Sequence, residues 1–167
     1  MSKFGPHLTL DQLTVTQHTE PDPKFGKPMN EVNKTLAQGA QVLDNLSRLD
    51  QLILEPMIEA LFPAGLQVHD AFRYPALNAA VGGSPTSQHQ VGQAADFIPV
   101  GYAEDLPRAL FMIAAWGLKD PKAPKFGQLL IENGCLHISL PRGHNDGEVA
   151  TWAHGVKHSW RPLLALA

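Results

Sequence analysis

One long helical pattern limits the folds that this chain can adopt more than any other feature of the sequence. Between Glu31 and Phe62, apolar residues recur at steps of three and four, which aligns them along one face of a helix. The apolar positions are Val32, Leu36, Ala40, Leu43, Leu46, Leu49, Ile53, Met57 and Leu61. Such a stripe must pack against a core, and 167 residues are enough to build one within a single domain. Pro56 is expected to kink this helix or to begin a second helical segment.

After this helix, short segments with strand character alternate with segments of helical character. Strands are expected at 66–72, 92–100, 126–133 and 135–140, and helices at the start of 73–88 and at 103–117. The dipeptide Asn133-Gly134 predicts a hairpin between the last two strands. This order of elements is typical of an α+β fold. Residues 1–30 are expected to form an irregular arm packed on the domain, and 31–167 to form that single domain.

Composition and charge narrow the class of protein. With 44% hydrophobic and 17% charged residues, the chain has the composition of a soluble globular protein. A net charge of -3 gives no reason to expect nucleic acid or an anionic membrane surface as a partner. Cys135 is the single cysteine, so an intramolecular disulfide is not expected. We expect neither a secretion signal nor membrane insertion, because the sequence has no apolar run of the required kind.

Asp96 stands at the start of an apolar strand, where a charge is costly unless something compensates it. A cationic side chain, a set of backbone donors or a metal ion would each serve. His89 lies seven residues earlier, across Gly92, and His137 lies in a later strand. Together the three residues offer the nitrogen and carboxylate ligands of a zinc site with one position open for water. Spacing alone leaves the alternative that they are a loop histidine, a capping aspartate and an unrelated strand histidine.

Three sequence blocks resemble one known family. The segment "SQHQVGQAAD" fits the pattern SxHxxGxAxD of zinc D-alanyl-D-alanine carboxypeptidases, a family that includes many phage endolysin peptidases. The preceding "FRYPALNAAVGGSPTSQH" and the later "FGQLLIENGCLHIS" are similar to blocks of its phage and prophage branch. The resemblance extends from about Leu8 to Ser139. It implies a hedgehog/D-Ala-D-Ala peptidase-like zinc fold: a small antiparallel sheet with helices packed on one side and the metal at the open face.

The resemblance also implies roles for individual residues. The ligands of Zn²⁺ would be His89, Asp96 and His137. Arg73 matches an arginine that holds the substrate's carboxylate or polarises its carbonyl, work that suits a planar guanidinium; the alternative is a surface ion pair. Ser87 matches a serine near the site and is expected either to bind substrate or to make a local turn hydrogen bond.

The general base is the weakest point of the match. Dipeptidases of the family carry a carboxylate three residues before the second histidine, and this chain has Gly134 there. Glu132, five residues before His137, matches the glutamate of the phage branch and is the preferred base. Five residues along one strand would put it on the opposite face unless the turn or a bulge corrects this. Asp70 is the reserve candidate, with a structural hydrogen bond or ion pair as its alternative role.

Two further positions differ from the sequence pattern of the phage branch. Gly127 replaces an aspartate of the phage branch, and Cys135 replaces a tryptophan. Cys135 alternates onto the same face of the strand as His137, so its thiol is expected near the metal. A nucleophilic Cys–His pair is one possibility, but a buried and unreactive cysteine fits neighbours in one strand better.

These features predict a zinc metallopeptidase that cleaves stem peptides of bacterial peptidoglycan, as a D-Ala-D-Ala carboxypeptidase or an endolysin-type endopeptidase. The water that attacks the peptide bond would lose its proton to Glu132, while Arg73 helps to polarise the carbonyl. The alternative is a catalytically inactive phage structural or wall-binding module that retains the fold and the metal, which the glycine at 134 favours. The protein is expected to be a monomer, located in the host cytoplasm until its release to the cell wall, or carried in a phage virion.

Overall fold

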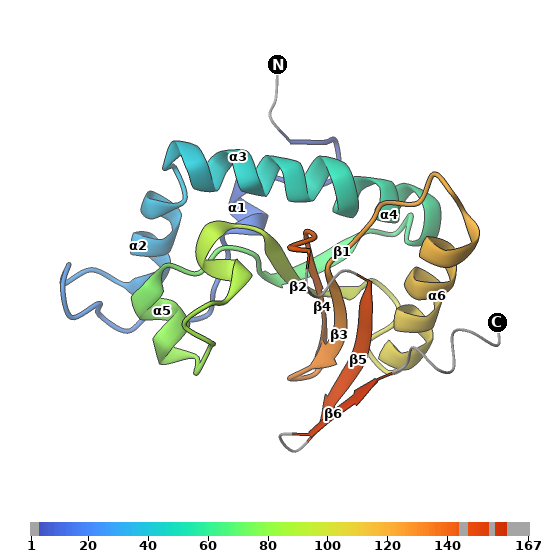
Figure 1. Ribbon diagram of the computed structural model, residues 1–167. Coiled ribbons are helices and arrows are strands. Elements are labelled where there is room, and N and C mark those ends of the chain that lie inside the picture. The colour runs from blue at the N-terminus through green and yellow to red at the C-terminus, as the bar shows by residue number, and fades with distance from the viewer. Residues whose placement is uncertain (1–3, 144–146, 154–155, 160–167) are drawn as a thin grey trace.

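The computed structural model describes residues 4–143, 147–153 and 156–159. The α-helices are α1 Leu10–Leu13, α2 Met29–Leu36, α3 Ala40–Leu49, α4 Glu55–Leu61, α5 Pro75–Ala80 and α6 Leu106–Lys119, and the other helical segments are the π-helix η1 Asp50–Leu54 and the 3₁₀-helix η2 Gln88–Val91. The strands are β1 Leu66–Asp70, β2 Ala94–Pro99, β3 Gln128–Glu132, β4 Cys135–Ser139, β5 Glu148–Ala153 and β6 Val156–Ser159. Figure 1 shows α3 and α4 as one long rod above the sheet, with α6 beside the strands.

The six strands form one sheet in the order β1-β2-β4-β3-β5-β6. Neighbouring strands are antiparallel except β3 and β5, which run parallel. α6 contacts β3 and β4, and α1 contacts β1. The α+β class with a mainly antiparallel sheet and packed helices is thereby confirmed. β5 and β6 were not expected, because the sequence after Leu140 has the turn-forming composition of a loop.

The apolar stripe between 31 and 62 folds into four consecutive segments rather than one helix. The main break lies at 37–39, where Gly39 precedes the first residue of α3 with extended backbone. The second change is η1, in which the backbone N–H of Glu55 donates to the carbonyl of Asp50, five residues earlier. This wider turn comes directly before Pro56, at the start of α4. Proline has no backbone N–H, and a residue in the first turn of a helix needs none, so Pro56 is tolerated at this position. None of the described helices is both long and apolar enough to cross a membrane.

Side chains along the central strands alternate between the face of the sheet that packs on the core and the face that carries the candidate site. In β2 and β4, Phe97 pairs with Leu136 on the core side, and both are fully buried. Their neighbours Asp96 and His137 pair with each other on the opposite face. Burying side chains such as Phe97 and Leu136 stabilises the fold by about 1.5–3 kcal/mol each. The same packing that holds these strands together therefore also presents the two polar side chains.

The N-terminal segment is tied to the loop that leads into the site. Leu13 in α1 is completely buried, and its carbonyl accepts a hydrogen bond from the backbone N–H of Phe72 at 3.2 Å. Asn33 donates from its amide to the carbonyl of Phe72 at 2.8 Å and accepts from the backbone N–H of Tyr74 at 3.1 Å. These bonds are made by the residues on either side of Arg73 in the chain, so α1 and α2 help to hold that residue in place.

Gly92 allows the loop between η2 and β2 to pass close to α3. Its φ is +71°, and a Cβ atom there would lie 2.9 Å from Cγ of Leu46 and 3.1 Å from the carbonyl oxygen of Val42. Both the backbone conformation and the available space therefore require glycine.

We expect Gly92→Ala to lower the free energy of unfolding by about 2–4 kcal/mol, because it adds overpacking to left-handed backbone strain. Gly101→Ala is the matched control: φ is +88° and a Cβ atom would have nothing within 4 Å. This control should lose only the strain of about 1–2 kcal/mol. Urea denaturation of both variants measures the difference, and equal losses would show that the approach to α3 is not tight.

Candidate metal centre

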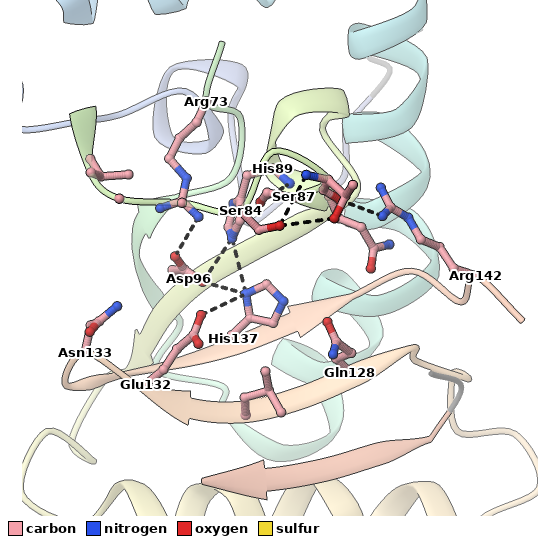
Figure 2. A pocket seen from close by; sticks show the side chains of 16 residues that line it. Arg73, Ser84, Ser87, His89, Asp96, Gln128, Glu132, Asn133, His137 and Arg142 are labelled. Atoms are coloured by element: carbon pink, nitrogen blue, oxygen red, sulfur yellow. Dashed lines mark hydrogen bonds and ion pairs between the residues drawn. The ribbon is translucent and has the colours of Figure 1, made fainter. Parts of the chain in front are cut away.

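Three buried side chains from three separate segments meet on one face of the sheet. Asp96 lies in β2 and His137 in β4, directly opposite each other in the antiparallel register. His89 belongs to η2, the short turn between α5 and β2. Ser87 caps that turn, because its hydroxyl accepts a hydrogen bond from the backbone N–H of His89 at 3.3 Å. Figure 2 shows the two imidazoles and the carboxylate pointing toward one another.

The three side chains form a small triangle of potential ligand atoms. His89 Nε2 is 3.2 Å from His137 Nδ1 and 3.2 Å from Asp96 Oδ1. His137 Nδ1 is 2.8 Å from the same Asp96 oxygen. All three residues are buried, and His89 is only 1% exposed. Tetrahedral coordination with bonds of about 2.0–2.1 Å places ligand atoms about 3.3 Å apart, so the triangle has the size that zinc requires.

The protonation of His89 supports the same conclusion. Its Nδ1 lies 3.1 Å from the carbonyl oxygen of Ala71, which can only accept, so this nitrogen carries a proton. Burial lowers the pKa of His89 and favours the neutral ring. In that ring Nε2 has a lone pair that faces the carboxylate oxygen of Asp96. Two acceptors repel each other at this distance unless a cation lies between them, and the backbone hydrogen bond is the usual support of a metal-binding histidine.

Asp96 is the buried charge that a strand position would ordinarily exclude. Burial opposes its ionisation, but the contact with His137, whose Nδ1 can donate a hydrogen bond to Asp96 Oδ1 at 2.8 Å, helps to keep the pKa of Asp96 well below its usual range. Arg73 adds positive charge, with Nη2 3.5 Å from Asp96 Oδ2. Asp96 is therefore an ionised carboxylate, which is the form that a metal ion binds. The donor set as a whole fits a divalent metal ion.

Glu132 reaches the face of His137 because of the turn between them. Asn133 and Gly134 form a two-residue hairpin turn in which both have positive φ, 49° and 75°, as a type I′ turn requires. Glu132 consequently pairs with Cys135, across the hairpin, instead of lying five residues away along one strand. Its Oε1 atom is 3.8 Å from Nδ1 of His137. The turn thus places this carboxylate beside the potential ligands.

Two glycines that depart from the resembling family have structural reasons. Gly134, where dipeptidases have a carboxylate, is the second turn residue, and its φ of 75° strongly favours glycine. Gly127, where the phage branch has aspartate, has no room for a side chain. A Cβ atom at this position would lie 2.6 Å from the carbonyl oxygen of Leu140. Neither glycine therefore marks a lost functional group in this backbone.

Asp70, the reserve candidate for the base, lies in β1 opposite Asp96. Burial raises the pKa of Asp70 to about 7, although the charge of Arg73 acts in the other direction. Its Oδ1 atom is buried and has no hydrogen-bond partner among the described residues. Glu132, by contrast, has a carboxylate oxygen 3.8 Å from Nδ1 of the candidate ligand His137.

Cys135 is buried on the site face of β4 and is not poised as a nucleophile. Its Sγ atom donates a hydrogen bond to the carbonyl of Glu132 at 3.3 Å. Burial raises the pKa of the thiol to about 12, and the carboxylates of Asp96 and Glu132 add to the effect. A thiol of this kind is almost fully protonated at neutral pH, whereas the thiolate is the reactive form.

Native protein is therefore expected to react with a thiol reagent at pH 8 only as fast as it unfolds. The measurement is mass spectrometry of labelled protein over time, with denatured protein as the control that must label at once. Immediate stoichiometric labelling of the native protein would contradict the buried position of Cys135.

The candidate ligands line a polar pocket of about 420 Å³. Its lining includes the predicted residues Arg73, Ser87 and Glu132, all of which the fold brings to the same place as the ligands. The lining also includes residues that sequence reasoning missed, namely Ser84, Thr86, Gln128 and Arg142. Arg142 gave no signal because it follows β4 in a segment with loop composition, and only the fold returns it to the pocket.

The family model described as peptidase M15 matches residues 24–116, which is more than half of the chain. The matched stretch contains Arg73, His89 and Asp96 and ends before Glu132 and His137. No curated protein matches the chain.

Proposed function

The chain belongs to the peptidase M15 family, and on that premise we propose that it is a zinc-dependent peptidase of bacterial peptidoglycan stem peptides. The observation that carries the proposal is the buried triangle of His89, Asp96 and His137, in which a histidine lone pair faces a carboxylate oxygen. The triangle opens into a polar pocket large enough for a few residues of a peptide. A purely structural cluster has no need of such access.

The metal and Arg73 would both act on the substrate carbonyl by polarising it. Zn²⁺ held by the three ligands would supply Lewis acidity, both to a peptide carbonyl and to a water molecule. Arg73 lies beside Asp96 at the pocket wall, and its Nε is buried without a hydrogen-bond partner among the described residues. The side chain also lines the pocket, so its guanidinium can hold a substrate oxygen, either the carbonyl or a terminal carboxylate.

Glu132 is the group to which the proposal assigns the proton transfer. Its carboxylate stands beside His137 and lines the pocket, within reach of a water molecule that approaches the ligands. In the proposed reaction it accepts the proton of that water and passes it to the leaving amine. Ser87 lines the same pocket while its hydroxyl caps η2, so its oxygen can accept one hydrogen bond from the chain and still contact substrate.

The second candidate function is an inactive wall-binding or phage structural module that retains the fold and the metal. The glycine at 134 would favour it by comparison with the dipeptidases, but the turn accounts for this glycine, and the position of Glu132 beside His137 opposes an inactive module. For either function we propose action at the bacterial wall, by a monomer that is released from the host cytoplasm or carried in a virion.

Digestion of purified peptidoglycan tests the proposal. Fragments released by the protein are identified by mass spectrometry before chelation, after chelation and after readdition of zinc. We expect new amino and carboxyl termini that disappear with chelator and return with zinc, and their identity names the bond. If metal-loaded protein cuts no bond in walls of several chemotypes, the peptidase proposal fails and the binding module takes its place.

A further inference from the structure

Gln128 and Glu132 stand at opposite ends of the site face of β3. Leu130, midway between them, is the residue that pairs with His137 in the antiparallel register. Side chains two residues apart emerge on the same face of a strand, and all three of these β3 side chains line the pocket. Each two-residue step covers about 6.6–6.8 Å, which fixes how far Gln128 lies along the strand from the level of His137. Figure 2 shows Gln128 and Glu132 on opposite sides of the His137 ring.

The backbone of Gln128 is held from both neighbouring strands. On the side of β4, its N–H donates to the hydroxyl of Ser139, a completely buried residue, at 3.1 Å. On the side of β5, it pairs with Glu148 in the parallel register. Gly127, directly before it, donates from its N–H to the carbonyl of Ser139 at 2.7 Å. The Gln128 side chain therefore starts from a fixed point, which lowers the cost of ordering it when a substrate binds.

The neighbours of the Gln128 amide decide which of its ends faces them. Its Nε2 donates to Oε2 of Glu148 at 2.5 Å, and the other oxygen of this carboxylate pairs with the ammonium group of Lys157. A carboxylate in an ion pair can only accept hydrogen bonds, so it must face the amide nitrogen and not the amide oxygen. Oε1 of Gln128 is consequently turned away from Glu148, and no residue in the described part of the chain donates a hydrogen bond to it. The pocket wall thus offers an uncharged acceptor that lacks a donor.

The chemistry of this acceptor favours the backbone of a peptide. A peptide chain carries one N–H for each residue other than proline, and each residue spans about 3.3–3.6 Å. A substrate whose carbonyl lies at the candidate ligands therefore brings an N–H to the level of Gln128 within about two residues of the scissile bond. A substrate ammonium group would favour a carboxylate instead, and Glu148 is already engaged by Gln128 and Lys157. An ester oxygen would be disfavoured, because its lone pairs would meet those of Oε1.

We propose that Gln128 is a specificity-determining residue, whose Oε1 accepts a hydrogen bond from a backbone N–H of the substrate within two residues of the scissile bond. The site then selects peptides that have an amide N–H at this position. It disfavours chains that have proline or an ester link there, because these leave the acceptor without a donor. This inference rests on the proposed function, since it assigns a part of the substrate to the same pocket.

The test compares the stem pentapeptide L-alanyl-D-isoglutamyl-L-lysyl-D-alanyl-D-alanine with analogues in which one amide N–H at a time is replaced by an ester oxygen. Calorimetry measures their dissociation constants for zinc-loaded Glu132→Gln, in which cleavage is slow. We expect one analogue to bind about fivefold to a hundredfold more weakly than the parent peptide, and this ratio to fall to about one when Gln128→Met is added. Adding Gln67→Met instead, at an exposed glutamine of β1, is the matched control that should keep the ratio.

Glu148→Gln provides a second variant that leaves Gln128 itself in place. A neutral amide at 148 can donate as well as accept, so it allows the Gln128 amide to turn round. The same ratio should therefore become smaller in this variant, and an unchanged ratio would contradict the orientation that Glu148 imposes.

The inference is overturned if Gln128→Met changes none of the ratios, if it weakens the parent and all analogues equally, or if none of the peptides binds. Equal weakening would mean that Gln128 supports only the sheet or the neighbouring His137. Hydrolysis by the wild type is measured separately. Its absence would refute the peptidase, while the binding ratios would still decide the role of Gln128.

Discussion

Glu132→Gln is expected to lower kcat for peptide hydrolysis by about 10²–10⁴-fold while leaving bound zinc at one ion per chain. Glutamine keeps the size of the side chain but cannot accept a proton, and general base catalysis contributes a factor of this order. Glu132 Oε1 lies 3.8 Å from His137 Nδ1 and is not one of the three clustered ligands, so the metal should stay in place. Steady-state kinetics together with metal analysis of the purified variant provide both numbers.

Asp70→Asn is the matched control, because Asp70 is the other carboxyl beside Asp96. If Glu132 is the base, the asparagine variant should keep most of the activity. A large loss of kcat in Asp70→Asn together with a mild effect of Glu132→Gln would reverse the assignment. The pH profile adds a second check, since the kinetic pKa of the base should vanish from the variant that lacks it.

Asp96→Asn is expected to abolish the stabilisation of the fold by zinc. A ligand that binds only the native state stabilises it by about 2.7–4.1 kcal/mol at 100–1,000 times its dissociation constant. Asp96 provides the single carboxylate oxygen of the triangle, and its loss leaves two imidazoles without a compensating charge. The measurement is urea denaturation of each protein with and without zinc, so that the effect of the substitution on the metal-free protein cancels.

The control for this experiment is the second group of metal-capable side chains, formed by His7, Glu55 and Glu59. That group is mostly exposed, and His7 Nδ1 already contacts Glu55 at 2.5 Å. Glu59→Gln should therefore leave the zinc effect unchanged. If zinc stabilised Asp96→Asn as much as the wild type and failed to stabilise Glu59→Gln, the metal would belong to the surface group instead.

Periodic patterns predicted those parts of the fold whose geometry depends on neighbouring residues alone. The Asn133-Gly134 hairpin formed as expected, because few dipeptides accept two consecutive positive φ values. The strands around Asp96 and His137 were likewise evident from their apolar neighbours. Pro56 was expected to kink the helix or to begin a second segment, and it stands at the start of α4. The break before α3 and the π-helix η1 were not expected, because the apolar pattern runs on through both.

The site was predictable only in part from the residues themselves. The spacing of His89, Asp96 and His137 left a metal site and three unrelated roles open, and the family resemblance supplied the choice. Contacts between distant segments, such as the Nδ1–H of His89 with the carbonyl of Ala71, leave no mark in sequence. Arg142 was missed for the same reason, since its position depends on how the segment after β4 is fastened to Gln88 and Gln93.

The most direct test of the central claim is a titration of metal-free protein with zinc in which bound metal and peptide hydrolysis are measured in the same samples. Hydrolysis should rise in proportion to occupancy and level off at one ion per chain, and Asp96→Asn should show neither binding at this site nor hydrolysis. Full occupancy without hydrolysis of any stem peptide, or hydrolysis that is complete before metal is added, would contradict a metallopeptidase centred on His89, Asp96 and His137.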